Sequence, residues 1–279
     1  MKAEELKRNP ICHCSDDKPK LLQVKIINKC TGDCWFCIDK GNFAPQKVDP
    51  DKMTKAILSE PNYPTVDITG GEPLLDFEVL LKVLRAIRPN KEYITLNTNG
   101  SLLTEEKVKQ LNGLIDFLKI GLQHYDETKN AEIIKTKIDF ENIKKSLKNR
   151  NFKVWFNMVI NKSWENDKEN FVNKLVELCK KLNVDGVSMN ELRYTGVNNG
   201  YKQYAEGHIK GYDFFQHLNV IKPKTSEQLI TEGCIDDFEY KGIEFRLKRL
   251  CGYKFKSQVQ TFKVIYSDGL KVDDWILDI

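Results

Sequence analysis

The fold is decided by residues 21–37, LLQVKIINKCTGDCWFC, where an apolar, β-branched run leads directly into three closely spaced cysteines. Residues 21–28 have the composition of a buried β-strand. Cys30, Cys34 and Cys37 follow on the next loop as a C-x3-C-x2-C triplet. Three of the eight cysteines thus fall within eight residues. In a reducing compartment such crowding indicates a metal site rather than a disulfide.

The pattern of residues 21–28 recurs five times downstream, and each recurrence is separated from the previous one by a stretch with helical periodicity. We expect further strands at Thr65–Thr69, Tyr93–Asn97, Phe117–Gln123, Lys153–Ile160 and Val184–Glu191. We expect helices at Asp51–Glu60, Phe77–Ile87, Thr104–Ile115, Lys137–Lys148 and Asn166–Leu182, with Asp51 and Thr104 as N-caps. Strands that alternate with helices form a parallel sheet through right-handed crossovers. The sequence therefore predicts an α/β fold, either an open sheet or part of a barrel.

Composition and charge exclude several classes of protein. The chain has 279 residues, of which 41% are hydrophobic and 30% charged, and its formal net charge is +4. A chain of this length buries roughly 70 to 75% of its extended surface, so it does not need the disulfides of a secreted scaffold. The mixed charge argues against stable DNA binding. No apolar run approaches the roughly 20 residues of a membrane span and residues 1–10 lack a signal-peptide core, so we expect a cytoplasmic protein without membrane contact.

The regular alternation ends near residue 193. We therefore divide the chain into an N-terminal extension, residues 1–20, a βα core, residues 21–192, and a C-terminal region, residues 193–279. In the last region Phe238–Leu247 and Gln260–Tyr266 have the composition of strands. The sequence Ser267-Asp268-Gly269 predicts a hairpin, because Asp-Gly supplies the positive φ angles of such a turn. We expect this region to be a mostly β, antiparallel addition.

The cysteine triplet is compatible with more than one metal centre. Thiolates select zinc, Cu(I) or iron-sulfur clusters. A structural zinc needs a fourth ligand, for which Cys12, His13 or Cys14 is available in the sequence. A [4Fe-4S] cluster held by three cysteines keeps one iron open.

The triplet and its position resemble the radical S-adenosylmethionine (radical SAM) enzymes. Their C-x3-C-x2-C loop follows the first strand of a partial (βα)6 barrel and usually has an aromatic residue before the last cysteine, here Phe36. The resemblance implies that Cys30, Cys34 and Cys37 hold a [4Fe-4S] cluster whose open iron binds S-adenosylmethionine. It implies that one electron, from a flavodoxin- or ferredoxin-type donor, cleaves the cofactor to a 5'-deoxyadenosyl radical that abstracts a substrate hydrogen. It also implies that residues 193–279 determine substrate specificity.

A second motif, Thr69-Gly70-Gly71-Glu72-Pro73, ends the second predicted strand, as the GGE motif of this family does. Glycines let the backbone approach a ligand closely, and the carboxylate of Glu72 suits the cofactor's ammonium group. Alone, the segment favours an ordinary Gly-Gly turn with a solvated glutamate. Two motifs in the family's order on consecutive strands favour the cofactor site.

Polar residues also follow the later strands, and parallel strands place such residues at one edge of the sheet. By resemblance we expect cofactor contacts from Thr98, Asn99, Gln123, Asn157, Asn190 and Glu191. His124 and Tyr125 are candidates for substrate binding or proton transfer. For each of these residues a turn, a buried hydrogen bond or a packing cluster is the competing explanation.

The remaining cysteines do not match the closely spaced pairs of an auxiliary cluster. Cys12, Cys14, Cys234 and Cys251 are scattered, and we expect no second cluster. Cys179 lies on the apolar side of a predicted helix and should be part of the core. Trp35, Trp155 and Trp275 could stack on a ring, although burial is the commoner explanation for each. His208 and His217 receive no role.

The substrate is the least determined feature. Within the radical SAM family, the length and the segment QHYDETKN (residues 123–130) resemble the queuine lyases, which release the base queuine from a queuosine nucleotide. A nucleotide phosphate needs basic partners, and residues 241–256 supply six, with Arg246, Lys248 and Arg249 as our candidates. A solvated basic strand is the competing explanation. The alternatives are a peptide- or protein-modifying maturase or activating enzyme, and a non-catalytic, zinc-stabilised binding protein.

Overall fold

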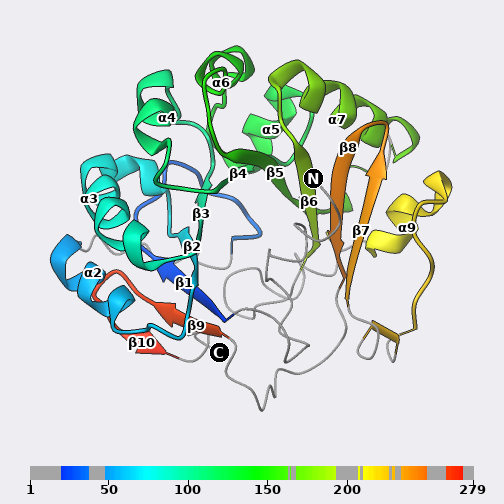
Figure 1. Cartoon of the computed structure of the whole chain (residues 1–279). Helices are drawn as coiled ribbons and strands as arrows, with labels where there is room; N and C mark the ends of the chain where they lie inside the picture. The colour runs from blue at the N-terminus through cyan, green and yellow to red at the C-terminus, as the bar shows by residue number, and fades with distance from the viewer. Residues whose placement is uncertain are drawn as a thin grey trace.

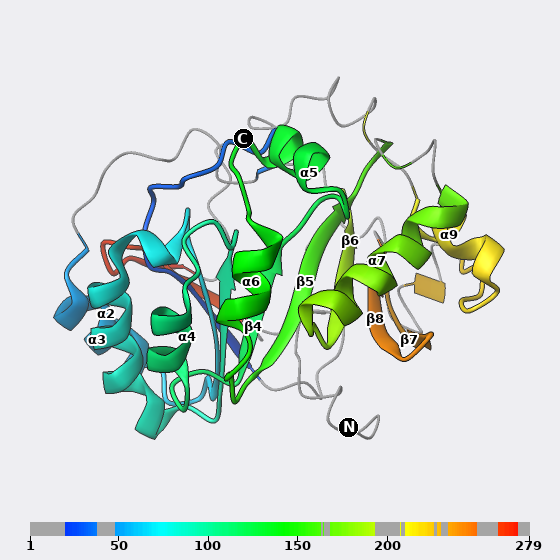
Figure 2. The ribbon, with the colours of Figure 1, turned by 90° about the horizontal axis from the view of Figure 1, so that it is seen from above.

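The computed structural model describes residues 20–37, 48–162, 164, 168–192, 207, 210–225, 228–229, 234–249 and 262–272. Its strands form one sheet in the order β10-β9-β1-β2-β3-β4-β5-β6-β8-β7. The sheet is strongly curved, and Figures 1 and 2 show the helices from α2 to α7 along its convex side. Within the described residues no helix is long and apolar enough to cross a membrane.

The six central strands confirm the predicted α/β core. They are β1 (Leu21–Lys25), β2 (Thr65–Thr69), β3 (Tyr93–Thr98), β4 (Phe117–Gly121), β5 (Lys153–Ile160) and β6 (Gly186–Glu191). All neighbouring pairs from β1 to β6 are parallel. Between them lie α2 (Pro50–Leu58), α3 (Phe77–Ile87), α4 (Glu105–Leu111), α5 (Glu127–Ile134), α6 (Phe140–Ser146) and α7 (Lys168–Leu182), with the 3-10 turns Pro73–Asp76 and Arg88–Asn90 beside α3.

The helix starts follow local capping, with one correction to the prediction. Thr104 caps α4 as expected, since its side chain accepts a hydrogen bond from the Lys107 amide. Asp51 is not the cap of α2, because the side chain of Asp49 accepts from the amides of Asp51 and Lys52. Helix α5 was not expected, because its sequence, ETKNAEII, is only weakly amphipathic. Asp126 starts it by accepting from the Lys129 amide.

The two faces of the sheet have opposite chemistry. Residues such as Val24, Ile68 and Leu96 alternate toward the helices and are wholly buried in one apolar core. The intervening residues face the concave side and include many polar groups. Among them Lys25, Asp67 and Lys119 are each at least 94% buried. Because side chains of a strand alternate between faces, this polar layer is a consequence of the strand register.

The C-terminal region differs from the predicted antiparallel addition. Residues 238–247, predicted as one strand, are divided between β7 (Ile235–Tyr240) and β8 (Ile243–Lys248). The turn between them has positive φ at Lys241 (51°) and Gly242 (81°), which produces a hairpin. Strand β8 then pairs with β6 in parallel. A short helix, α9 (Gly211–Phe215), and the turn Gln216–Leu218 precede this hairpin, and Figure 1 places α9 beside β7.

The last hairpin attaches to the other edge of the core. Strand β9 (Phe262–Ile265) pairs with β1 in parallel, and β10 (Lys271–Val272) pairs with β9 in antiparallel fashion. The predicted hairpin at Ser267-Asp268-Gly269 is therefore confirmed. Only Gly269 has a positive φ (83°), whereas Asp268 does not, so the turn depends on the glycine alone. The C-terminal region thus contributes one parallel strand to each edge of the core.

Candidate functional site

The motifs that follow the first three strands meet at the carboxyl edge of the sheet. The cysteine loop follows β1, the Gly-Gly-Glu segment follows β2, and Thr98-Asn99 ends β3. Hydrogen bonds join them in pairs, from Gly71 N to Ile27 O (2.7 Å) and from Asn99 N to Glu72 Oε2 (2.6 Å). The structure therefore brings together the residues that the sequence places at three separate strand ends.

The two glycines contact protein backbone in this structure. A Cβ atom on Gly71 would lie 2.1 Å from Lys29 O, and one on Gly70 would lie 2.4 Å from Ile27 O. The Glu72 amide also donates to Lys29 O at 2.9 Å. The sequence predicted close approach of these glycines to a ligand; here they let the end of β2 pack against the residues that lead into Cys30.

Glu72 is buried and fully engaged in hydrogen bonds. Its side chain has no exposed surface. Oε1 accepts from Leu74 N (2.9 Å) and from the Thr98 hydroxyl (2.7 Å), and Oε2 accepts from Asn99 N. Burial raises the pKa of Glu72, and these hydrogen bonds oppose the rise. The solvated glutamate of the competing explanation is therefore excluded, and contact with an ammonium group stays a prediction.

Asn99 connects the end of β3 to the cysteine loop. Its Nδ2 donates to the Thr31 hydroxyl at 2.7 Å and lies 3.8 Å from the Cys30 sulfur. The Gly32 amide approaches the same sulfur at 3.4 Å. Hydrogen bonds to sulfur are a common means by which proteins tune metal-bound thiolates. The predicted role of Asn99 in direct cofactor contact is not tested by these contacts.

Helix α5, which the sequence analysis missed, supports the cysteine loop from the other side. The Ile134 carbonyl at its end accepts from Asp33 N at 2.9 Å and lies 3.9 Å from the Cys34 sulfur. Burial, together with the nearby Cys37 and Cys30 sulfurs, raises the pKa of Cys34 to about 12. The contact is made by a backbone carbonyl, which every residue has. No sequence pattern distinguishes the carbonyl of Ile134, so this support could not have been predicted.

The donor set fits an iron-sulfur cluster better than a single ion. Cys30, Cys34 and Cys37 are all half-buried free thiols. Within the described part of the chain, no three His, Cys, Asp or Glu side chains are arranged to hold one metal ion. In a cluster each thiolate binds a different iron, so the sulfurs lie farther apart than the ligands of one ion. Positive charge among the three sulfurs would offset the burial and the repulsion that raise the pKa of Cys34.

The polar residues of the later strands mostly bond to neighbouring strands. Gln123 is 4% exposed, and its side chain donates to Asn157 O (3.4 Å) and accepts from Val159 N (2.9 Å). Asn190 donates to the side-chain oxygen of Asn157 at 2.9 Å. Glu191 accepts from the Gly211 amide at 2.5 Å. Buried hydrogen bonds are thus the roles that the structure records for these residues, and their contacts with a cofactor stay predictions.

His124 and Tyr125 belong to an aromatic cluster. The His124 ring is 3% exposed and lies 5.4 Å from the ring of Phe171. Its Nδ1 accepts from the Asp126 amide at 2.9 Å. Lys174 donates to the Tyr125 hydroxyl at 3.0 Å. Substrate binding by this pair stays a prediction beside the packing role.

The basic residues of β8 have acidic partners that the sequence analysis did not pair with them. Arg246 forms two hydrogen bonds with the Asp237 carboxylate, at 2.7 and 2.9 Å. Arg249 lies 2.6 Å from Asp236 Oδ2. Lys248 is half-buried at the end of the same strand. Both guanidinium groups are thus occupied by the adjacent strand, so a phosphate would have to displace a carboxylate.

Several sequence predictions concern other cysteines and tryptophans. Cys179 is completely buried in the core, as expected. Cys234 is 7% exposed beside Leu229. Trp155 is 2% exposed, and Trp35 packs against Phe36 with ring centroids 5.4 Å apart. The following residues lie outside the described part of the chain: Cys12, His13, Cys14, His208, Cys251, Lys254, Lys256 and Trp275.

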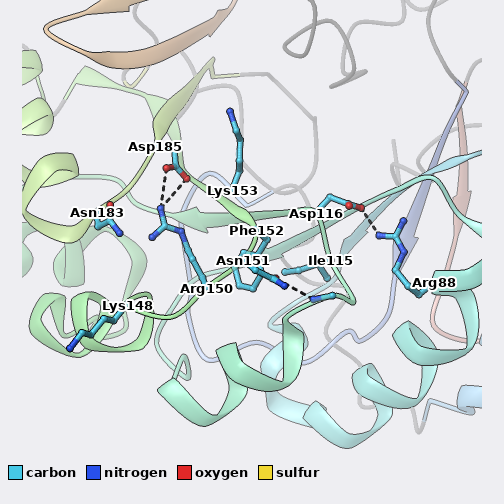
Figure 3. Close-up of a pocket in the computed structure, with 11 residues that line it drawn as sticks. Arg88, Ile115, Asp116, Lys148, Arg150, Asn151, Phe152, Lys153, Asn183 and Asp185 are labelled. Carbon is cyan, nitrogen blue, oxygen red and sulfur yellow. Dashed lines mark hydrogen bonds and ion pairs between the residues drawn. The ribbon is translucent and has the colours of Figure 1, made fainter. Parts of the chain in front are cut away.

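A cavity of about 630 Å³ lies at the opposite edge of the sheet, near the amino ends of β4, β5 and β6 (Figure 3). Four of its charged groups form two ion pairs. Arg88 lies 2.5 Å from Asp116, and Arg150 donates to both carboxylate oxygens of Asp185 at 3.0 and 3.1 Å. Each aspartate also accepts an amide of the preceding strand, from Ile94 and Val154 respectively. These contacts join adjacent strand starts, away from the cysteine loop.

Comparison with known proteins agrees with the site. The family model for the Radical SAM superfamily matches residues 24–175. The chain belongs to the radical SAM superfamily. Its fold, its use of S-adenosylmethionine and its [4Fe-4S] cluster follow from that membership.

Individual radical SAM relatives are distant. The pyruvate formate-lyase-activating enzyme of Staphylococcus aureus is 23% identical over 198 residues, covering 65% of this chain and 78% of that protein. Streptococcus suis SuiB bound to S-adenosylmethionine superimposes with a TM-score of 0.67 at 17% identity, over 92% of this chain and 60% of SuiB. Native anSMEcpe with bound AdoMet and Cp18Cys peptide gives a TM-score of 0.58 at 17% identity, over 93% of this chain and 76% of that one. This chain therefore spans less than two thirds of SuiB.

Proposed function

We propose that Cys30, Cys34 and Cys37 hold the [4Fe-4S] cluster of this radical SAM enzyme and that the Gly-Gly-Glu segment binds the cofactor's amino-acid end. The observation that supports this is the direct packing of Gly71 and Glu72 on the residues before Cys30, with backbone hydrogen bonds of 2.7 and 2.9 Å. When bound, the reduced cluster supplies the electron that cleaves S-adenosylmethionine to a 5'-deoxyadenosyl radical. The Asn99 side chain and the Gly32 amide orient the Cys30 sulfur.

The buried concave face of the sheet would exclude water from such a radical. Its polar layer, which includes Asp67, Lys119 and Asn157, lies directly below the carboxyl edge where the cysteine loop sits. A reactive intermediate needs a site that is closed to solvent and that orients one substrate bond. We assign the substrate to this face, with a flavodoxin- or ferredoxin-type protein as electron donor and the cytoplasm as location.

The substrate that we propose is a queuosine nucleotide, from which queuine is released after hydrogen abstraction from the ribose. The length of the chain, the lack of an auxiliary-cluster cysteine pattern and the segment QHYDETKN, which resemble the queuine lyases, support this choice. The polar concave face, with amide, hydroxyl and ammonium groups, is also suited to a small hydrogen-bonding molecule.

A second candidate is a peptide- or protein-modifying activity. The relatives named above support it, since one is an activating enzyme and another was solved with a bound peptide. Their identities of 23% and 17% leave the substrate of this chain open.

One anaerobic experiment separates the two candidates. Reconstituted and reduced protein is incubated with S-adenosylmethionine and either queuosine 5'-phosphate or a peptide mixture from the host proteome, and products are detected by mass. We expect queuine and 5'-deoxyadenosine together in the first sample. Formation of 5'-deoxyadenosine above background only with the peptides would replace the nucleotide proposal with the maturase.

A further inference from the structure

Lys119 is a buried cation whose charge is not neutralised by a hydrogen-bonded carboxylate. It lies in the middle of β4 on the concave face, with 5% of its side chain exposed. Its nearest carboxylate, Asp67 Oδ2, is 3.8 Å from Nζ, beyond hydrogen-bond distance. Asp67 Oδ1 already accepts from Asn97 Nδ2 at 2.5 Å. Among the described residues no hydrogen bond reaches the three N–H groups of the Lys119 ammonium.

Two further buried donors lie on adjacent strands and also lack partners. Trp155, which pairs with Lys119 across β4 and β5, is 2% exposed, and its Nε1 has no hydrogen-bond acceptor in the described part of the chain. Ser188, on β6, is also 2% exposed, and no described residue hydrogen-bonds to its hydroxyl. A buried donor without an acceptor is costly, so native proteins rarely retain one without a use.

Aromatic contacts join Lys119 to Trp155, and the register of β5, β6 and β8 adds Ser188 to the same patch. The Phe117 ring lies 5.7 Å from Lys119 Nζ and 5.6 Å from the Trp155 ring. The guanidinium carbon of Arg246 lies 5.9 Å from the centre of the Trp155 ring. Arg246 also pairs with Ser188 in the register of β6 and β8. The guanidinium of Arg246 is already bonded to Asp237, and the Trp155 ring is packed against Phe117. The polar groups that remain for a ligand are Lys119 Nζ, Trp155 Nε1 and the Ser188 hydroxyl.

These three groups share one chemical character. An ammonium and an indole N–H can only donate, and a hydroxyl can donate. Together they match a group that is anionic and rich in acceptor oxygens. Asp67 limits the charge of the patch, and its Oδ1 accepts from Asn97, which pairs with Lys119 in the register of β3 and β4. From the sequence, phosphate binding was expected in residues 241–256, with Arg246, Lys248 and Arg249 as candidates. Of these, Arg246 and Arg249 have guanidinium groups that are occupied by Asp237 and Asp236.

We propose that Lys119, assisted by Trp155 Nε1 and the Ser188 hydroxyl, binds the phosphate of the substrate on the concave face of the sheet. This proposal rests on the nucleotide substrate proposed above and replaces the basic segment with Lys119 as the phosphate-binding group. It places the phosphate beside the Lys119–Trp155 pair, two register positions before Gly121 and Asn157, which are the last pair between β4 and β5. The remainder of the nucleotide then extends toward the carboxyl edge, where the cysteine loop lies.

The test compares substrates that differ only in the phosphate. Reconstituted wild type, Lys119→Met, Ser188→Ala and Trp155→Phe are assayed with queuosine 5'-phosphate and with queuosine. We expect the wild type to prefer the phosphate at least tenfold in kcat/KM. In Lys119→Met this preference should fall to near unity through KM, and in the other two variants it should fall several-fold. Lys82→Met, which removes an exposed surface charge, is the control and should keep the wild-type preference.

A binding measurement without turnover makes the two proposals separable. Calorimetric titration with inorganic phosphate should give a Kd at least tenfold weaker for Lys119→Met than for wild type, and acetate should bind more weakly than phosphate to wild type. If queuine is never released but phosphate binding depends on Lys119, the substrate assignment fails and the phosphate site stands. If queuine is released and Lys119→Met keeps the preference for phosphate, the site fails and the function stands. If Lys119→Met does not fold, the preference for the phosphate in kcat/KM is compared in Trp155→Phe and Ser188→Ala instead. Tighter binding of acetate than of phosphate to the wild type overturns the phosphate assignment.

Discussion

Gly71→Ala is a sharp test of how the Gly-Gly-Glu segment supports the cysteine loop. The new Cβ would lie 2.1 Å from Lys29 O, where ordinary contacts begin at 3.4 Å, so the backbone before Cys30 must move by about 1.3 Å. Such a shift breaks the hydrogen bonds to Ile27 O and Lys29 O, at a cost of roughly 1 to 3 kcal/mol for the pair. We expect a folded protein with a lower melting temperature and less than half of the wild-type iron and sulfide after anaerobic reconstitution.

The matched control is Gly121→Ala, at the end of β4. Its Cβ would lie 3.6 Å from Thr98 O, an ordinary contact, so iron content should equal that of wild type. Iron and sulfide are measured chemically, and stability is measured by thermal unfolding of the unreconstituted protein. A Gly71→Ala protein that binds about four irons per chain and has the melting temperature of the wild type would refute this prediction.

The remaining predictions concern the site and its supports. Replacing all three loop cysteines by alanine should abolish the brown colour and the roughly four irons per chain, and retention of the iron would assign the cluster elsewhere. Total iron in the wild type should be about four, not eight, and should not change in Cys234→Ala. Glu72→Ala leaves three hydrogen-bond donors without their carboxylate and should lower the unfolding free energy by roughly 3 kcal/mol or more, measured by urea titration. An unfolding free energy that falls less in Glu72→Ala than in Glu72→Gln would contradict this. Although burial alone raises the pKa of Glu60, its hydrogen bonds with Lys263 and Lys271 hold that pKa below 4.5. The stabilisation, about 1 kcal/mol, is therefore present above pH 4.5 and is lost as the pH falls through the folded pKa. Glu60→Gln should therefore be less stable than wild type at pH 7, and the difference should shrink as the pH falls below 4.5.

The core of the fold could be predicted from sequence because its strands are short apolar runs separated by clear helical periodicity. Strands β2 and β5 and helix α3 have the predicted bounds. Helix α5 was missed because capping by Asp126 starts it and its hydrophobic pattern is weak. The edges to which β8 and β9 attach depend on contacts between segments far apart in sequence, and local pattern carries no information about them.

The candidate site was predictable as a set of strand ends but not as a set of contacts. Topology alone brings Cys30, Glu72 and Asn99 together, because parallel strands share a carboxyl edge. The burial of Glu72 and the pairing of Arg246 with Asp237 arise from partners that only the folded chain reveals. For the same reason the uncompensated ammonium of Lys119 could not be recognised in a sequence rich in lysine.

The attachment of β9 beside β1 affects the order in which the protein can fold during synthesis. Strand β1, which leads into the cysteine loop, pairs with β2 on one side. Its other side pairs with Phe262–Ile265, which are synthesised much later. Until residues 262–265 have left the ribosome, one row of β1 amides and carbonyls is an open edge that other chains can pair with. Contacts of such long sequence separation also slow folding. Truncation within the last hairpin should therefore favour aggregation of nascent chains and should reduce the yield of soluble protein more than the small size of the hairpin implies.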